Sequence, residues 1–306
     1  PLRYVPYAYA PFEVTIRTIM GMPLIKASPE VNEVVIGIIG RALSLYDVRL
    51  YDLVVFNTHI EYNLGPRDAE ALARFRAYVH ANIAKEMGRI HGWRGPFWSR
   101  RGRPIPIVDE QALEDRTQYI YKHGVKEGFV TSPLDWPGVA SARVTGEPLV
   151  GYWFDRTAEY QARRQGKHFG KYDFATRYEI ELSPLPCWEH LSEVEYRAKV
   201  VQMVKDIEEE ATDAARDGKR FAGIEWLEAQ DPFEIRKNVK RSPAPLCHAS
   251  TRANREQYRK DYDSFADAYY DAAGALVEGI LDVAFPEGCF PRPRPFVTPV
   301  ESFAPS

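Results

Sequence analysis

Two short stretches of the chain carry side chains that could bind a metal ion or attack a phosphorus atom. His59 and Glu61 are two residues apart, and Tyr119 and His123 are four residues apart. On a strand, residues two apart leave the same sheet face, and on a helix residues four apart are neighbours. Imidazole and carboxylate groups bind divalent ions, and a tyrosine hydroxyl can act as a covalent nucleophile. Each pair alone is also compatible with a solvated strand face, or with a core tyrosine beside a surface histidine.

A third stretch, residues 89–108, is rich in arginine and aromatic residues and contains no acidic residue. Guanidinium groups bind phosphates, and aromatic rings stack on unpaired bases. Ordinary packing of aromatic rings against arginine is the structural alternative. The residues that we expect to contact nucleic acid are Arg94, Trp98, Arg100, Arg101 and Arg103.

The first half of the chain must position these groups, and its hydrophobic periodicity predicts alternating strands and helices. The expected strands cover residues 12–19, 49–57, 59–64 and 105–108, and the expected helices cover residues 28–45 and 68–90. The order strand, helix, strand, strand, helix, strand is that of a ferredoxin-like (split βαβ) arrangement. The sequence therefore predicts an α+β fold.

A further helix is expected from Glu110 to His123, where Gly124 can end it. Tyr119 and His123 lie on this helix, whereas His59 and Glu61 lie on a strand. The four residues form one site only if this helix packs on the sheet face that His59 and Glu61 share.

The second half of the chain has a different organisation. Residues 145–190 have the composition of a loop-rich segment, and helices are expected from Ser192 to about residue 214 and from Ser250 to about residue 280. We expect a core domain over residues 1–143 and a mostly helical extension over residues 144–306, with an extended proline-rich tail from about residue 285.

The composition limits the classes of protein. The 306 residues are 45% hydrophobic and 27% charged, which is typical of a soluble globular chain. The longest apolar runs are too short to span a bilayer, and no signal peptide is recognisable. Three widely spaced cysteines, Cys187, Cys247 and Cys289, argue against a disulfide scaffold or zinc ribbon and suit a reducing cytoplasm. Residues 1–143 carry 18 Lys and Arg against 15 Asp and Glu, and the remainder 22 against 28. We therefore expect any contact with nucleic acid in the first half of the chain.

Several motifs together resemble a known family, the REP-associated tyrosine transposases of the single-tyrosine HUH endonuclease superfamily. The resemblance covers most of the chain. The stretches that carry it are Leu2-Arg3-Tyr4-Val5-Pro6, Phe97-Trp98-Ser99-Arg100-Arg101, Tyr119-Ile120, residues 123–130 and Asp135-Trp136-Pro137. A long subgroup with a C-terminal helical extension is similar to this chain also at residues 182–188 and 240–246.

The resemblance implies roles for individual residues of an HUH-type core. By that comparison Tyr119 is the nucleophile, and His59, Glu61 and His123 are the ligands of a Mg²⁺ or Mn²⁺ ion. The family has a second histidine where this chain has Glu61, and an asparagine where it has Thr58. Carboxylate oxygen suits these hard ions, so the set with Glu61 can still bind one. The added negative charge partly cancels that of the ion and places catalytic activity in doubt.

The implied activity is that of a metal-dependent single-strand DNA endonuclease and strand transferase, as in a transposase. Its partner would be single-stranded or hairpin DNA lying along the basic, aromatic stretch. No contact with a membrane is expected. Tyr119 would attack the phosphorus, retain the 5′ side as a phosphotyrosine and release a 3′-OH. The resemblance also implies a cytoplasmic, nucleoid-associated protein and admits a homodimer.

Two other interpretations remain open at the level of sequence. A relative with weak or no catalytic activity could bind DNA or a protein without cutting, an alternative motivated by Glu61. The set His59, Glu61 and His123 also matches a two-histidine, one-carboxylate iron centre for oxygen chemistry. We see no barrel of short strands that would accompany such a centre.

Overall fold

The computed structural model describes residues 4–143, 148–235 and 244–290. The expected domain boundary after residue 143, part of the motif at 240–246 and the tail beyond residue 290 lie outside the described residues. The first half contains the strands β1 (Phe12–Arg17), β2 (Val48–Phe56), β3 (His59–Pro66) and β4 (Arg103–Pro106), and the helices α1 (Pro29–Leu45), α2 (Ala69–His91) and α3 (Glu110–Lys126). Single 3₁₀ turns cover Ile19–Gly21, Pro133–Asp135, Ser141–Arg143 and Pro186–Trp188.

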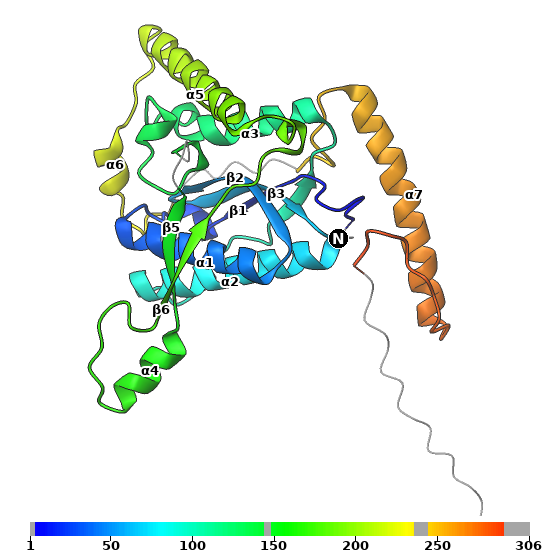
Figure 1. Ribbon diagram of the computed structural model, residues 1–306, viewed down its shortest axis with the longest axis horizontal. Coiled ribbons are helices and arrows are strands. Elements are labelled where there is room, and N and C mark those ends of the chain that lie inside the picture. The colour runs from blue at the N-terminus through cyan, green and yellow to red at the C-terminus, as the bar shows by residue number, and fades with distance from the viewer. Residues whose placement is uncertain (1–3, 144–147, 236–243, 291–306) are drawn as a thin grey trace, which may run out of the picture.

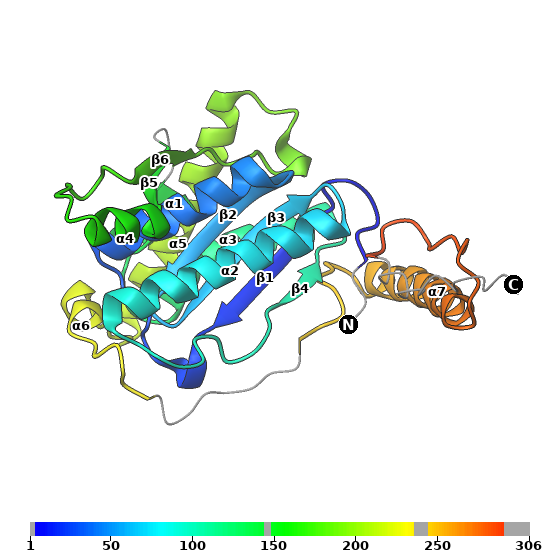
Figure 2. The ribbon, with the colours of Figure 1, turned by 90° about the horizontal axis from the view of Figure 1, so that it is seen from below.

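The four strands form one sheet in the order β2-β3-β1-β4, and every neighbouring pair is antiparallel. The chain order strand, helix, strand, strand, helix, strand agrees with the order expected from the sequence. Helices α1 and α2 cover one face of the sheet, and α3 lies on the opposite face (Figures 1 and 2). The fold is therefore a mixed α+β fold in which α3 covers the sheet face opposite to that covered by α1 and α2.

Strand β3 is buried along its whole length, and its two faces differ in chemistry. Ile60, Tyr62 and Leu64 belong to the apolar core that also contains residues of α1 and α2. Since side chains alternate along a strand, His59 and Glu61 leave the opposite face, toward α3. Buried polar groups require hydrogen-bond partners, so this face restricts how α3 can pack.

Helix α3 begins as the sequence predicts, but it ends later. Asp109 caps it by accepting a hydrogen bond from the N–H of Ala112. The prediction that Gly124 ends the helix is wrong, because the helix continues to Lys126. A Cβ atom on Gly124 would lie 3.0 Å from Val130 and 3.2 Å from Trp136, so glycine here permits close packing. The requirement for glycine at this position comes from contacts with distant residues, so the neighbouring sequence does not indicate it.

The expectation of a loop-rich segment over 145–190 is also wrong in part. The hairpin β5 (Leu149–Phe154) and β6 (Ala175–Ile180) lies against α1, and α4 (Arg156–Arg164) connects its strands. A side chain on Gly37 of α1 would overlap the backbone of Tyr152. Phe154 and Ile180 enter the core beneath the sheet. The hairpin depends on this close contact between two backbones. The hydrophobic periodicity of the sequence does not predict such a contact.

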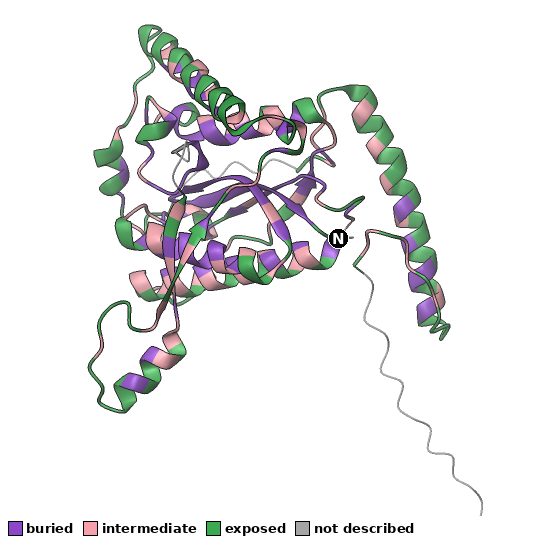
Figure 3. Ribbon diagram, viewed as in Figure 1, coloured by how far each residue is buried: buried purple, intermediate pink, exposed green. Residues whose placement is uncertain are grey.

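The remaining described residues are mainly helical, as the sequence predicts. Their helices are α5 (Glu193–Arg216), α6 (Ile224–Glu228) and α7 (Arg252–Val277). Helix α5 packs on the side of α3, whereas α7 lies beside the body of the molecule and is largely exposed (Figures 1 and 3). No helix in the described ranges is long and apolar enough to cross a membrane.

Candidate functional site

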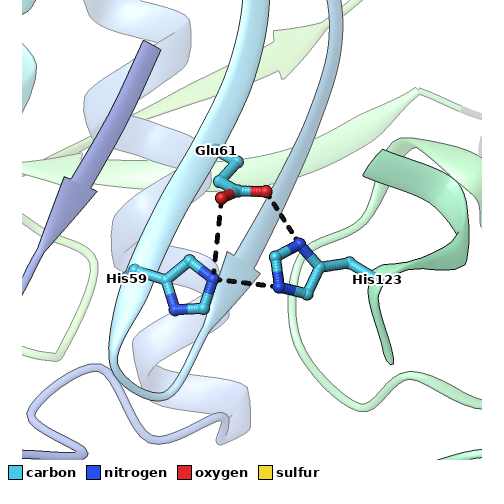
Figure 4. Close-up of side chains that lie close together, drawn as sticks. All are labelled: His59, Glu61 and His123. Atoms are coloured by element: carbon cyan, nitrogen blue, oxygen red, sulfur yellow. Dashed lines mark hydrogen bonds and ion pairs between the residues drawn. The ribbon is translucent and has the colours of Figure 1, made fainter. Parts of the chain in front are cut away.

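His59, Glu61 and His123 converge in the structure, as the sequence requires of a single site. His59 and Glu61 come from β3, and His123 comes from α3 (Figure 4). The Nε2 atoms of the two histidines are 3.3 Å apart, and the Nδ1 atom of His123 is 2.7 Å from Oε2 of Glu61. One ligand atom from each residue can be chosen so that all three lie within 4.8 Å of one another, a spacing that could hold a metal ion.

Hydrogen bonds orient both imidazole rings. An ionised carboxylate only accepts, so Nδ1–H of His123 donates to Glu61 and a neutral His123 has its lone pair on Nε2. The Nδ1 atom of His59 is 2.9 Å from the hydroxyl of Thr58, which can donate or accept. When Thr58 accepts, His59 also presents a lone pair at Nε2. The two rings can therefore direct two nitrogen lone pairs at one point.

These donor atoms suit a divalent cation. The two Nε2 atoms are 3.3 Å apart, so their lone pairs repel each other unless a proton or a cation lies between them. Imidazole nitrogen and carboxylate oxygen are ligands of Mn²⁺, and carboxylate oxygen suits Mg²⁺. Glu61 can serve in two ways, through Oε1, which is 3.9 Å from Nε2 of His59, or as the group that orients His123.

An apolar wall surrounds the three polar side chains. The ring of Phe56 stacks on His59 at 4.8 Å and lies 4.2 Å from the ring of His123. Trp136 packs on Phe56 at 4.3 Å, and its indole N–H donates to the carbonyl of Val55. The side chains of the cluster are nearly inaccessible, so charges within it are weakly screened by water.

A pocket of about 50 Å³ opens beside the two histidines. Such a space holds a few water molecules or a hydrated ion, but not a nucleotide base. Its lining includes four polar residues that the sequence did not indicate, namely Arg17, Asn57, Glu127 and Gln230. Glu127 follows His123 by one helical turn, a spacing visible in the sequence, and its carboxylate lies 4.0 Å from Nε2 of His123. Arg17 and Gln230 had no local signal, because only the fold brings them to the pocket.

Tyr119 lies next to this cluster, but its hydroxyl is at the surface. Its ring meets that of His123 edge to face at 5.3 Å. The hydroxyl accepts a hydrogen bond of 3.2 Å from the ammonium of Lys126, and the guanidinium of Arg116 lies 4.0 Å from the ring centre. Tyr119 does not line the pocket. The structure thus places the phenol beside the histidines and between two cations, where an anionic phosphate is electrostatically favoured.

A buried ion pair holds Arg116 in this position. Glu13 of β1 accepts hydrogen bonds from Nε of Arg116 at 2.8 Å and from Nε2 of His248 at 2.6 Å. Burial disfavours the Glu13 carboxylate, but the hydrogen bond from His248 and the charge of Arg116 outweigh it and hold the pKa of Glu13 below its usual value. The segment before α7 therefore helps to orient a cation that contacts Tyr119.

A second buried carboxyl lies under α3. Asp52 of β2 accepts hydrogen bonds from Thr117 at 2.7 Å and from the side-chain amide of Asn63 at 3.0 Å. Complete burial raises the pKa of Asp52 to about 7, although these hydrogen bonds oppose the shift. Asp52 thus ties α3 to the sheet next to the turn that carries Tyr119.

The basic, aromatic stretch runs along the end of β1. Its backbone pairs with that strand, since the N–H of Ser99 donates to the carbonyl of Arg17. Trp98 is half-buried, and its indole N–H donates to the carbonyl of His80. The four arginines predicted to bind nucleic acid, Arg94, Arg100, Arg101 and Arg103, are all exposed. Their contact with nucleic acid, and that of Trp98, stays a prediction.

No protein-family model matches the chain, and no curated protein matches it. A solved structure of a REP-associated tyrosine transposase bound to a REP hairpin is similar over 44% of this chain and 77% of its own. The two are 19% identical, with a TM-score of 0.36.

Proposed function

We propose that this protein cuts and joins single-stranded or hairpin DNA through a phosphotyrosine intermediate, as REP-associated tyrosine transposases do. The proposal includes a ferredoxin-like, HUH-type core over residues 1–143, a helical extension beyond it, and Mg²⁺ or Mn²⁺ at the cluster of His59, Glu61 and His123. The observation that carries it is the convergence of that cluster next to Tyr119, from two elements that are far apart in the sequence.

Each residue has a defined part in the reaction. The Tyr119 oxygen forms a bond to phosphorus, the bond from phosphorus to the 3′ oxygen breaks, and the leaving oxygen takes a proton to become a 3′-OH. Arg116 and Lys126 lie against the Tyr119 ring, where they attract the phosphate. A bound divalent ion supplies positive charge that polarises the scissile phosphate. Joining is the reverse step with another 3′-OH, and it needs no external energy source.

A second candidate function is DNA binding without cutting. Two observations favour it. Glu61 occupies the place of the family's second histidine, and the Tyr119 hydroxyl accepts a hydrogen bond from Lys126 outside the pocket. The cut requires Tyr119 to leave that hydrogen bond for the phosphorus. A protein that only binds would keep this arrangement.

Covalent capture separates the two functions. The protein is incubated with Mn²⁺ and a hairpin single strand labelled at its 3′ end, or in a second reaction at its 5′ end. We expect a protein–DNA adduct in denaturing gels with the 3′ label alone, because Tyr119 retains the 5′ phosphate of the downstream fragment. Tyr119→Phe abolishes the adduct, since phenylalanine has no nucleophile.

The matched control is Tyr270→Phe, which removes another exposed tyrosine hydroxyl on α7 and leaves the adduct intact. DNA binding without any adduct, at all Mn²⁺ concentrations, would contradict cutting and favour the second function. No binding of hairpin or linear single strands at low salt would exclude both.

A further inference from the structure

The hairpin β5–β6 and helix α4 form an arm whose tip is strongly basic. The tip, residues 160–172, contains four Lys or Arg residues and one histidine but no acidic residue. It resembles in this respect the stretch 89–108, which starts at the same end of the sheet and then runs along β1 as β4. The arm projects from the α1 side of the molecule, and its tip is mostly green, exposed ribbon in Figure 3.

The base of the arm is fixed to the core and is electrically balanced. Arg156 forms ion pairs with Glu86 of α2 at 2.6 Å and with Glu159 at 2.7 Å. Strand β5 lies directly on α1, with the guanidinium of Arg41 at 3.4 Å from the ring centre of Trp153. The tip is therefore held on a rigid support.

The four cations of the tip are exposed, but Lys171 is already paired with Glu33 of α1 at 2.6 Å. Within the described residues, Arg164 and Lys167 have no acidic partner, and Arg163 has a long pair with Glu159 at 3.8 Å. Two exposed aromatic rings flank them, since Tyr160 is 61% and Tyr172 is 49% exposed; the Tyr172 ring also packs on that of Tyr152 at 4.7 Å. Guanidinium and ammonium groups beside open aromatic rings match a phosphate backbone with unpaired bases.

A hollow connects the arm to the rest of this end of the molecule. It has a volume of about 430 Å³ and lies between the arm and the ends of α1 and α2. Arg89 at the end of α2 lines it and pairs with Glu30 at the start of α1. The basic stretch begins in the last turn of α2, and α4 and α6 lie at one end of the sheet in both views (Figures 1 and 2). Leu227 of α6 lines the candidate pocket, so arm and pocket share that end.

We propose that the tip of the arm, residues 160–172, is a second contact for the backbone of single-stranded or hairpin DNA. It binds the strand away from the phosphate that meets Tyr119, and so increases affinity without contacting the reacting atoms. The proposal rests on the proposed function, because it assumes that the protein binds DNA at the pocket end of the sheet.

Salt dependence of DNA binding tests this contact. The variant Arg163→Gln/Arg164→Gln/Lys167→Gln removes three exposed charges and keeps the ion pairs of Arg156 with Glu86 and Glu159. Each phosphate contact on a single strand contributes about 0.7 to the slope of log affinity against log salt, so we expect the slope to fall by about 2. Fluorescence anisotropy with a labelled hairpin strand measures it across salt concentrations.

The control variant, Arg197→Gln/Lys205→Gln/Arg216→Gln, removes the same charge from exposed positions on α5. An unchanged slope in the arm variant, or an equal fall in the control, overturns the proposal. A wild-type protein that binds no DNA overturns the proposed function, and this contact with it. Normal binding and adduct formation with an unchanged arm variant overturns the arm contact alone and directs the search to an acidic protein partner.

Discussion

Helix α3 has two faces that organise charge in opposite ways. On the inner face, toward the sheet, Thr117 and His123 meet the buried carboxyl groups of Asp52 and Glu61. On the outer face, Tyr119 lies among cations at the surface. Buried polar groups must be partnered, so the inner geometry is determined almost atom by atom. The side chains on the outer face are hydrated and can change conformation when a ligand binds. We therefore expect substitutions on the inner face to have large, specific effects and those on the outer basic surface to have small, additive effects.

The largest effect is expected at Glu61. Glu61→Gln keeps an oxygen that accepts from Nδ1–H of His123 but removes the negative charge. Groups that orient or bind beside a metal-binding histidine typically change metal affinity by about 10- to 100-fold. We expect a loss of that size in Mn²⁺ affinity, measured by isothermal titration calorimetry, with unchanged helix content.

Glu127→Gln is the matched control for Glu61. It removes the same charge from a carboxylate 4.0 Å from the ring of His123 that is about half exposed. Screening by water limits its effect, so we expect a smaller loss of Mn²⁺ affinity. A larger loss in Glu127→Gln than in Glu61→Gln would reverse the comparison and make the exposed side the metal-binding side.

An intermediate effect is expected at Asp52, as a dependence of stability on pH. Burial raises the pKa of Asp52 to about 7, above the ordinary value of 3.8 that applies when the chain is unfolded. The protonated form is therefore favoured by folding. The contribution of Asp52 to the free energy of unfolding is fully present below about pH 4, and it is lost as pH rises through about 7.

Asp52→Asn is neutral at every pH and removes this dependence. The free energy of unfolding of the wild type minus that of the variant should fall by about 1 kcal/mol per pH unit between pH 5 and 7, and level off above. Urea denaturation at several pH values measures the difference. A difference independent of pH would mean that water reaches the inner face.

The smallest effect is expected on the outer surface. Arg100→Gln/Arg101→Gln removes two exposed guanidinium groups from the basic stretch. The slope of log affinity against log salt for single-stranded DNA should fall by about 1.4. The fold should be unaffected. An unchanged slope would place the DNA path elsewhere, and loss of folding would show that these arginines belong to the packed interior.

Much of the site could be predicted because it depends on local geometry. The twofold repeat of a strand placed His59 and Glu61 on one face, and the helical repeat placed Tyr119 beside His123. The four strands of the larger sheet, the main helices and their order followed from periodicity and caps such as Asp109, whereas β5 and β6 did not.

Other features exist only in the folded chain. The packing of α3 on β3 depends on contacts such as that of Gly124 with Trp136, and the hairpin β5–β6 depends on the close approach of Tyr152 to Gly37. Asp52 reads in the sequence as an ordinary acidic residue of a strand, yet burial changes its protonation. The sequence alone determined which side chains share a strand face or a helix turn, because backbone periodicity is local. Only the tertiary structure decided which of those faces meet and how far water is excluded between them, because both depend on packing between distant segments.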